Sequence, residues 1–288
     1  MLTVAAALRQ ARDALTRHSE TAALDAQTLL AAVIHRDRAW LLAHPEARLT
    51  PRQQRRLARE CTRLARGVPL PYVLGYRHFY GRKFAVTPSV LIPRPETELL
   101  VELALPRLQG CGRCRVADVG TGSGAIAVTL AAEAPEARVT ATDISPAALA
   151  VARDNARRHR VADRISFVET DVLAALTGPF DVIVANLPYI PAAELETLPV
   201  ARHEPREALD GGPDGLAFIR RLLTQARARL APDGLLLLEI AAHQGKVAGA
   251  LAANAFPHAD VQLHRDLAGH DRVVAITNPK SQIFNPKS

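Results

Sequence analysis

One short motif, Asn186-Leu187-Pro188-Tyr189, carries residue types that could hold a planar amino group for reaction. An amide nitrogen is a poor nucleophile because its lone pair is delocalised into the carbonyl, so it must be aimed and its lone pair freed. The Asn186 side-chain oxygen and the Leu187 backbone carbonyl could each accept one N–H of such a group and position it at about 3–3.5 Å from its electrophile. Pro188 stiffens the turn, and Tyr189 offers a flat apolar wall. The alternative is an ordinary turn that ends a strand.

A glycine-rich turn, Asp118-Val119-Gly120-Thr121-Gly122-Ser123-Gly124, is typical of a strand that runs into a helix beneath a nucleotide. Glycine permits backbone conformations closed to other residues and lets a ligand approach the main chain without a Cβ in the way. Free N–H groups at the start of the helix could hold a carboxylate or phosphate. Asp143 ends the next predicted strand about 20 residues later, where a carboxylate accepts hydrogen bonds from ribose hydroxyls.

These two features indicate an adenosine-type cofactor on a Rossmann-like sheet without distinguishing S-adenosylmethionine from NAD. Gly120, Gly122 and Ala125 also satisfy the dinucleotide fingerprint. Asp171, after the third predicted strand, could bond an exocyclic adenine amine, although aspartate is also an ordinary turn residue. The motif at Asn186 favours methyl transfer, because the carboxyl ends of the strands line one crevice and no motif marks the proton donor that an NAD oxidoreductase needs.

Helical periodicity dominates the first part of the chain. Apolar residues recur at helical spacing over residues 2–15 and 23–33, and a short third helix is expected over 39–43. Thr50-Pro51 is a start signal, a capping residue followed by proline, for a fourth helix that ends at Gly67. The pattern predicts a small bundle with short connections.

Strands alternate with helices in the larger, second part of the chain. A segment rich in proline, glycine and aromatics precedes it, with a hairpin expected over residues 77–86 and a helix over 96–105. The alternation predicts an open parallel α/β sheet. Strands are expected over 116–119, 138–142, 165–168, 180–185, 235–240, 261–263 and 273–277, and helices over 125–132, 146–158, 217–230 and 245–254. We therefore divide the chain into a bundle (1–70), a connector hairpin (71–94), an α/β domain (95–278) and a tail (279–288).

The formal net charge of +7 comes almost entirely from arginine. It could serve an anionic partner such as RNA, or it could be an ordinary solvated surface. We favour the solvated surface, because the arginines are spread along the chain without a single basic run.

The three cysteines, Cys61, Cys111 and Cys114, are expected to be free thiols in a reducing compartment. Cys111 and Cys114 form a C-x-x-C, which could be a redox pair or half of a zinc site, but no second pair exists to complete a tetrahedral site. The N-terminus has no signal-peptide stretch, and the apolar run 235–242 is too short to span a bilayer. These features predict a cytoplasmic protein without membrane association or metal.

With these residues in place, the chain resembles the HemK-type (PrmC) family of release factor glutamine methyltransferases over nearly its whole length. Its Asn-Leu-Pro-Tyr motif is similar to the Asn-Pro-Pro-Tyr of amino methyltransferases, and the most specific string is Pro93-Arg94-Pro95-Glu96-Thr97-Glu98. The other matching segments are residues 25–30, 71–75, 79–81, 91–92, 118–124, 204–209, 239–240, 244–245 and 266–272.

The resemblance implies a class I methyltransferase fold, an N-terminal helical bundle that binds the release factor, and S-adenosyl-L-methionine as cofactor. The implied substrate is the glutamine of the Gly-Gly-Gln loop of class 1 peptide chain release factors, methylated at the side-chain nitrogen (N5). A monomer that does not bind nucleic acid directly is expected. The implied cofactor-binding residues are Gly120, Thr121, Gly122, Ser123, Gly124, Asp143, Asp171, Val172 and Asn186. The implied substrate-binding residues are Leu91, Asn186, Leu187, Pro188 and Tyr189, of which the last four are also the implied catalytic residues.

One departure from the family pattern is Leu187, which stands where proline is commoner but keeps the backbone carbonyl. The same Asn-Leu-Pro-Tyr form resembles that of rRNA adenine methyltransferases, which also present a planar NH₂. A ribosomal-protein glutamine methyltransferase, an adenine-N6 RNA or DNA methyltransferase and a non-catalytic adenosine-binding module are the alternatives. Against a nucleic-acid substrate, the sequence has no basic-aromatic cluster suited to stacking bases.

Overall fold

The structure, a computed structural model, describes residues 2–279 and divides into two compact units, residues 1–76 and 77–288. The boundary falls within the segment expected as a connector. Of the expected tail, 279–288, all but Pro279 lies outside the described residues. Among the described helices, none combines the length and the apolar character needed to cross a membrane.

The first unit is a helical bundle whose four predicted helices are confirmed: α1 (Val4–Leu15), α2 (Ala22–Ile34), α3 (Arg38–Ala43) and α4 (Pro51–Ala65). Thr50 caps α4 in a reciprocal capping box with Gln53, as the Thr50-Pro51 signal predicts. A fifth helix, α5 (Leu70–Leu74), lies in the proline-rich segment and was not predicted. Apolar side chains of α1, α2 and α4 share one core.

The predicted hairpin, β1 (Tyr76–Phe79) and β2 (Arg82–Ala85), begins at the last residue of the first unit. A 3₁₀ turn, η1 (Pro95–Thr97), and α6 (Glu98–Gln109) follow it. A seven-stranded sheet follows, in the order β5-β4-β3-β6-β7-β9-β8. Its strands are β3 (Arg115–Val119), β4 (Arg138–Asp143), β5 (Ile165–Glu169), β6 (Phe180–Ala185), β7 (Leu230–Glu239), β8 (Asp260–Arg265) and β9 (Asp271–Thr277).

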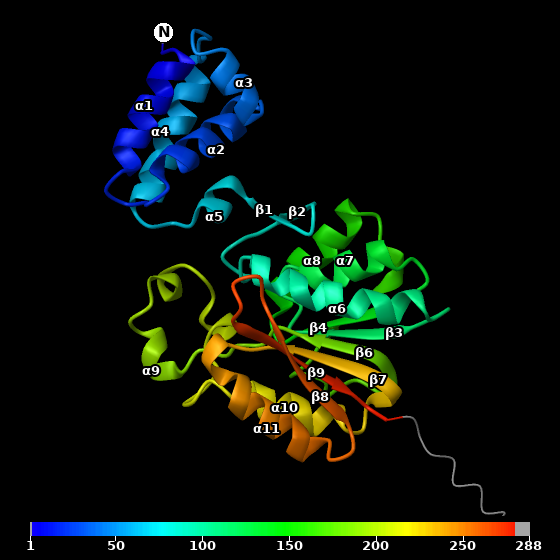
Figure 1. The fold of residues 1–288 in the computed structure, drawn as a ribbon. Coiled ribbons are helices and arrows are strands. Elements are labelled where there is room, and N and C mark those ends of the chain that lie inside the picture. The colour runs from blue at the N-terminus through cyan, green and yellow to red at the C-terminus, as the bar shows by residue number, and fades with distance from the viewer. Residues whose placement is uncertain (1, 280–288) are drawn as a thin grey trace, which may run out of the picture. The chain divides into compact units, whose positions relative to one another are not determined.

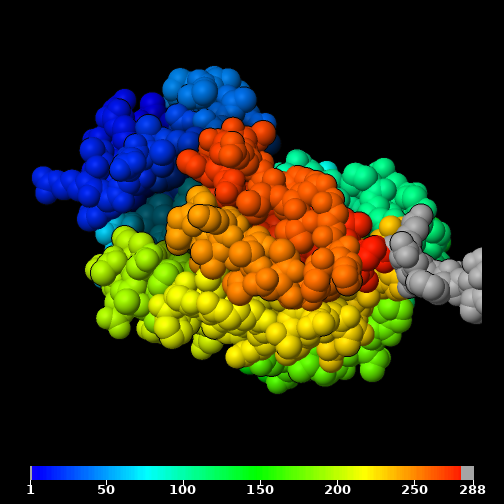
Figure 2. All heavy atoms as spheres, turned by 60° about the horizontal axis from the view of Figure 1, so that its bottom comes forward, coloured from blue at the N-terminus to red at the C-terminus, as the bar shows by residue number. Residues whose placement is uncertain are grey.

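Helices cover both faces of this sheet (Figure 1). On one face lie α6, α7 (Ala125–Glu133) and α8 (Pro146–Arg158), and on the other lie α10 (Ala217–Ala226) and α11 (Gly245–Ala255). Figure 2 shows α10 and α11 side by side in yellow and orange. Each face has its own apolar core, and a short helix, α9 (Ala192–Leu195), lies in the long connection between β6 and α10.

Two expectations about the sheet are corrected. The sheet is not wholly parallel, because β9 runs antiparallel to both β7 and β8. Only five residues join β8 to β9, and so short a link forms a hairpin rather than a parallel crossover. The helix expected over 217–230 ends at Ala226, because the following residues pair with β6. Leu230 pairs with Phe180, and the Arg229 carbonyl accepts a hydrogen bond from the Phe180 N–H.

Candidate active site

The register of the central strands brings the predicted motifs to one edge of the sheet. Val119, the last residue of β3, pairs with Thr142 of β4 on one side and with Ala185 of β6 on the other. The three strands therefore end at the same carboxyl edge of the sheet, where they place Gly120, Asp143 and Asn186 close together. The strand order reverses at β3, and such a switch point is where open α/β sheets bind their ligands.

The three glycines of the turn have positive φ angles, +72° at Gly120, +53° at Gly122 and +78° at Gly124. A Cβ on Gly120 would lie 2.9 Å from Leu187 Cδ2, and one on Gly124 would lie 3.1 Å from Ala152 Cβ. A Cβ on Gly122 would meet nothing within 4 Å. Two of the glycines therefore allow close packing of the protein, and Gly122 leaves room for a ligand.

Two carboxylates brace this turn from within the protein. Asp143 accepts hydrogen bonds from the backbone N–H groups of Gly122 and Ser145, each at 2.9 Å, and burial raises its pKa. Asp118 is fully buried and accepts from the Thr121 hydroxyl at 2.6 Å and from the Ala127 N–H at 3.0 Å. Its burial raises its pKa to about 7. No role was predicted for Asp118, although it begins the motif.

A cavity of about 490 Å³ opens beside the turn. It is lined by eleven of the site residues predicted from the sequence: Leu91, Gly120, Thr121, Gly122, Ser123, Asp143, Asp171, Val172, Asn186, Leu187 and Pro188. Gly124 packs against Ala152 of α8, and its role in cofactor binding stays a prediction. Asp171 forms an ion pair with Arg221 at 2.7 Å on the exposed rim.

A smaller cavity of about 180 Å³ shares Leu91, Asn186 and Leu187 with the larger one and is also lined by Tyr189. Asn186 therefore stands where the two cavities meet. Its Nδ2 donates to the Thr97 hydroxyl oxygen at 3.0 Å. Among the described residues, neither Asn186 Oδ1 nor the Leu187 carbonyl accepts a hydrogen bond, so both acceptors are available for a ligand.

The opposite wall of the cavities comes from the proline-rich string. Arg94 forms an ion pair with the buried Glu204 at 2.6 Å, and the same carboxylate accepts from the Ile92 N–H at 3.0 Å. This contact ties the segment around Leu91 to the long connection after β6. No role was predicted for Arg94, Thr97 or Glu204, although they lie in two segments that match the family, the Pro93–Glu98 string and residues 204–209.

The turn after Asn186 is held closely from behind. The Gln244 side chain donates to the Tyr189 carbonyl at 3.1 Å, and a Cβ on Gly215 would lie 2.3 Å from that same oxygen. The Tyr189 hydroxyl lies 3.5 Å from Glu239 Oε1. Burial, reinforced by the nearby Glu239, raises the pKa of Tyr189 to about 12, so the phenol is a neutral donor.

Cys111 and Cys114 are not free thiols: they form a disulfide, which corrects the expectation. Their Cα atoms lie 5.6 Å apart, within the range that a disulfide can bridge. Together with a carboxylate oxygen of Asp181 the two sulfurs form a cluster within 4.8 Å. The cluster lies where β3 and β6 begin, at the edge of the sheet opposite the cavities. Cys61 is a free, buried cysteine.

Two family models match the chain. Residues 95–202 match the methyltransferase small domain, and residues 6–75 match the PrmC N-terminal domain. The chain is 48% identical over 251 residues to the release factor glutamine methyltransferase of Moorella thermoacetica, covering 86% of this chain and 89% of the relative. It is 40% identical over 276 residues to the protein of the same name from Coxiella burnetii, covering 95% and 98%.

One of the similar solved structures supports the same fold for the larger unit. The T. thermophilus 16S rRNA N2 G1207 methyltransferase, in complex with AdoMet and guanosine, aligns with a TM-score of 0.51 at 20% identity, covering 70% of this chain and 49% of that one. The release factor-specific protein-(glutamine-N5) methyltransferase of Alicyclobacillus acidocaldarius is 34% identical, with a TM-score of 0.43 over 68% of this chain and 99% of that one.

Proposed function

The chain belongs to the family of release factor glutamine methyltransferases, and on that premise we propose that it methylates N5 of the glutamine in the Gly-Gly-Gln loop of class 1 peptide chain release factors. The observation that carries the proposal is the pair of unused acceptors, Asn186 Oδ1 and the Leu187 carbonyl, at the meeting point of two cavities. A primary amide offers two N–H donors, which such a pair matches.

We propose S-adenosyl-L-methionine as the cofactor, held in the larger cavity. The residues present fit it: Gly122 leaves its side open, and Asp143 lies at the carboxyl edge where ribose hydroxyls would bind. Asp171 and Val172 would flank the adenine, and the turn from Gly120 would face the amino-acid end. When bound, the cofactor supplies a sulfonium-activated methyl group.

The protein's own contribution is to position and activate the amide. Two acceptors on its two N–H groups orient the nitrogen and increase the electron density available to it. Methylation would join the nitrogen to the methyl carbon while the bond from that carbon to the cofactor's sulfur breaks and its electron pair stays on sulfur; the nitrogen would give up one proton during or after that step. Because the electrophile is already activated, orientation is the larger contribution the protein can make. Leu91 and Tyr189 would close the smaller cavity around the glutamine side chain.

The same proposal assigns release factor binding to the helical unit and places the reaction in the cytoplasm, where translation terminates. The proposal also takes the protein to act as a monomer.

The test is to incubate the full chain and labelled S-adenosyl-L-methionine with a release factor or, separately, with rRNA and ribosomal proteins, and to locate the label by mass spectrometry. We expect label on the Gly-Gly-Gln glutamine and none on a release factor in which that glutamine is replaced by alanine. Label in RNA or in a ribosomal protein, with none on the release factor, would overturn the proposal.

A further inference from the structure

A buried carboxylate, Glu239, lies against the Asn186 motif without a role in the reaction as derived so far. It is the last residue of β7 and only 1% exposed. Its Oε2 has no hydrogen-bond partner among the described residues. Burying an incompletely paired carboxylate is unfavourable, so an apolar residue would serve packing better. Packing alone therefore does not explain why a glutamate stands at position 239.

Glu239 is connected to the reacting end of the site through Thr97. Thr97 is 4% exposed, and its hydroxyl, as a donor beside the carboxylate, lowers the pKa of Glu239. With its proton directed at Glu239, the Thr97 oxygen is left to accept the Asn186 Nδ2–H at 3.0 Å. An amide carries its oxygen opposite its NH₂ group, so holding the NH₂ at Thr97 leaves Oδ1 as the end available to a substrate.

The same carboxylate also faces the other end of the motif. The Tyr189 hydroxyl lies 3.5 Å from Glu239 Oε1, a long hydrogen bond in which the neutral phenol is the donor. Thr97 and Tyr189 come from segments 92 residues apart, and both direct a hydroxyl at one carboxylate. Glu239 thus faces one hydroxyl from each cavity, since Thr97 lines the larger cavity and Tyr189 the smaller one.

We propose that Glu239 is a positioning residue: in its carboxylate form it acts through Thr97 to hold the Asn186 amide with Oδ1 toward the substrate. The inference rests on the proposed function and adds to it a dependence on pH. A protonated Glu239 offers one acceptor and a competing O–H donor. The Thr97 hydroxyl can then donate to Asn186 Oδ1 instead, which favours an Asn186 side chain rotated by half a turn. In that orientation the Asn186 NH₂ would face the NH₂ of the substrate amide, and neither group could accept a hydrogen bond from the other.

The surroundings place this change near neutral pH. Burial raises the pKa of Glu239 to about 7; Thr97, Arg272 and Tyr189 counteract the rise, and Glu96 adds to it. Glu96 comes from η1, Arg272 from β9 and Tyr189 from the turn after β6, so the charged and titratable groups facing Glu239 come from three elements. Since the carboxylate is the active form, the turnover rate falls as pH drops through about 7.

The experiment measures kcat, KM and cofactor affinity of the full chain with a release factor and S-adenosyl-L-methionine between about pH 5.5 and about pH 9, which covers roughly 1.5 units below and roughly 2 units above the expected transition. We expect Glu239→Gln and Thr97→Val each to lower kcat by roughly tenfold to a hundredfold, the loss typical of groups that orient a ligand-binding side chain. Thr97→Ser, which keeps the hydroxyl, should retain most of the activity. The acid limb of the wild-type kcat profile should be absent in Glu239→Gln, and cofactor affinity should be unchanged.

A double variant separates this role from general destabilisation. Thr97→Val/Glu239→Gln should be no slower than Thr97→Val alone, because both changes interrupt one chain of contacts. The inference would be overturned if the loss of kcat in the double variant equalled the product of the two single losses. It would also be overturned if Glu239→Gln kept the wild-type kcat and the acid limb of the pH profile. If Glu239→Gln does not fold, the contrast between Thr97→Val and Thr97→Ser decides it. A wild-type chain that leaves glutamine unmethylated defeats the proposed function instead, so the two failures are distinguishable.

Discussion

At the residue scale, methyl transfer depends most directly on Asn186. Asn186→Ala removes one of the two acceptors and leaves the turn's backbone in place. We expect kcat to fall by about 10²–10³, as when one hydrogen-bonding group that orients a reacting atom is deleted. Isothermal titration should find the affinity for S-adenosyl-L-methionine largely kept. Asn254→Ala, at an exposed asparagine of α11, is the matched control. Cofactor affinity lost in proportion to activity would contradict the assigned role.

Asp118 makes the stability of the protein depend on pH in an unusual direction. Its pKa is about 7 in the folded chain, against an ordinary value of 3.8, because the carboxyl is fully buried. Between these values the native state holds a proton that the unfolded state releases, so stability falls as pH rises from about 4 to about 7. The fall amounts to something on the order of 3 kcal/mol.

Asp118→Asn removes this ionisation. Urea unfolding at pH 5 and pH 8 should show a smaller loss of stability between the two pH values for the variant than for the wild type. A residual slope in the same direction is expected from Glu239, whose pKa is also raised to about 7. Equal slopes for the two proteins would show that Asp118 is not the source.

Sequence reasoning identified the residues that face the ligand but not the ones that support them. Asn186 and Gly122 stand in short motifs whose chemistry can be deduced locally. Thr97 bonds to a residue 89 positions away, and Glu204 bonds to residues 110 and 112 positions away. Such pairs are determined by the tertiary fold, so a single sequence marks them only as unexplained strings such as the one from Pro93 to Glu98.

At the element scale, the positions of the strands were predictable because each follows a period and a turn signal. Once β3, β4 and β6 are parallel neighbours, their carboxyl ends must meet, which is why Gly120, Asp143 and Asn186 share a site. The direction of β9 and the end of α10 were not predictable in the same way. Both depend on which backbone groups the sheet pairs, and that choice overrides helical periodicity.

Asn155, on α8, joins three elements that the site depends on. Its buried side chain accepts from the Ala85 N–H at 2.8 Å and donates to the Ala85 carbonyl at 3.0 Å and the Ser123 carbonyl at 2.8 Å. Asn155→Ala leaves these backbone groups unpaired and should lower the free energy of unfolding by roughly 1–3 kcal/mol. It should also weaken cofactor binding, since Ser123 belongs to the glycine turn.

The control for this change is its neighbour Asp154, which makes an exposed ion pair with Arg157 at 2.9 Å on the same helix. Asp154→Ala should alter unfolding in urea very little, because exposed pairs contribute little to stability. If the two substitutions have similar effects on stability and on cofactor affinity, the bridging role of Asn155 is wrong.

At the scale of the whole molecule, charge is divided unevenly between the two units. Residues 1–76 contain twelve arginines and six acidic residues, a net of +6 out of the chain's +7. The arginines form no continuous basic run in the sequence, because helical spacing separates those that share one face. Six arginines at positions 52, 55, 56, 59, 63 and 66 of α4 and its C-cap fall within about 100° of one helix face. The larger unit, which contains both cavities, is nearly neutral.

This arrangement predicts that the helical unit attracts an acidic surface of the protein substrate. Arg52, Arg55 and Arg66 are exposed, and changing all three to glutamine leaves the ion pairs of Glu60 with Arg59 and Arg63 intact. We expect KM for a release factor to rise by roughly tenfold at low salt, with kcat unchanged, since exposed charges act mainly on encounter. The difference from the wild type should shrink toward physiological ionic strength.

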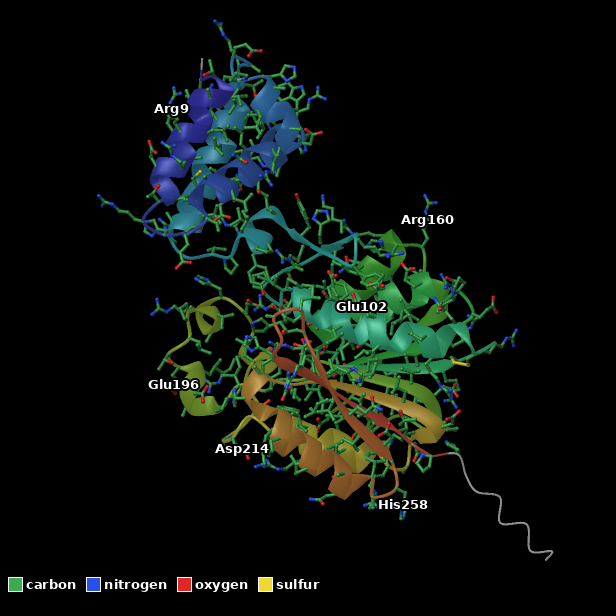
Figure 3. All side chains as sticks on the ribbon, viewed as in Figure 1. Arg9, Glu102, Arg160, Glu196, Asp214 and His258 are labelled. Carbon is green, nitrogen blue, oxygen red and sulfur yellow. A yellow bond between two sulfur atoms is a disulfide. The ribbon has the colours of Figure 1, made fainter. Side chains whose placement is uncertain are left out.

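Two comparisons make this prediction specific to the helical unit. A matched triple change of exposed arginines in the larger unit, Arg113, Arg160 and Arg227 to glutamine, should leave KM nearly unaltered; Arg160, like Arg9 of the first unit, points away from its own unit (Figure 3). A short peptide carrying the Gly-Gly-Gln sequence should be methylated equally by all three proteins, because it is too small to reach a second site. If both triple changes raise KM alike, net charge alone steers the substrate, and the face of α4 has no particular part in recognising it.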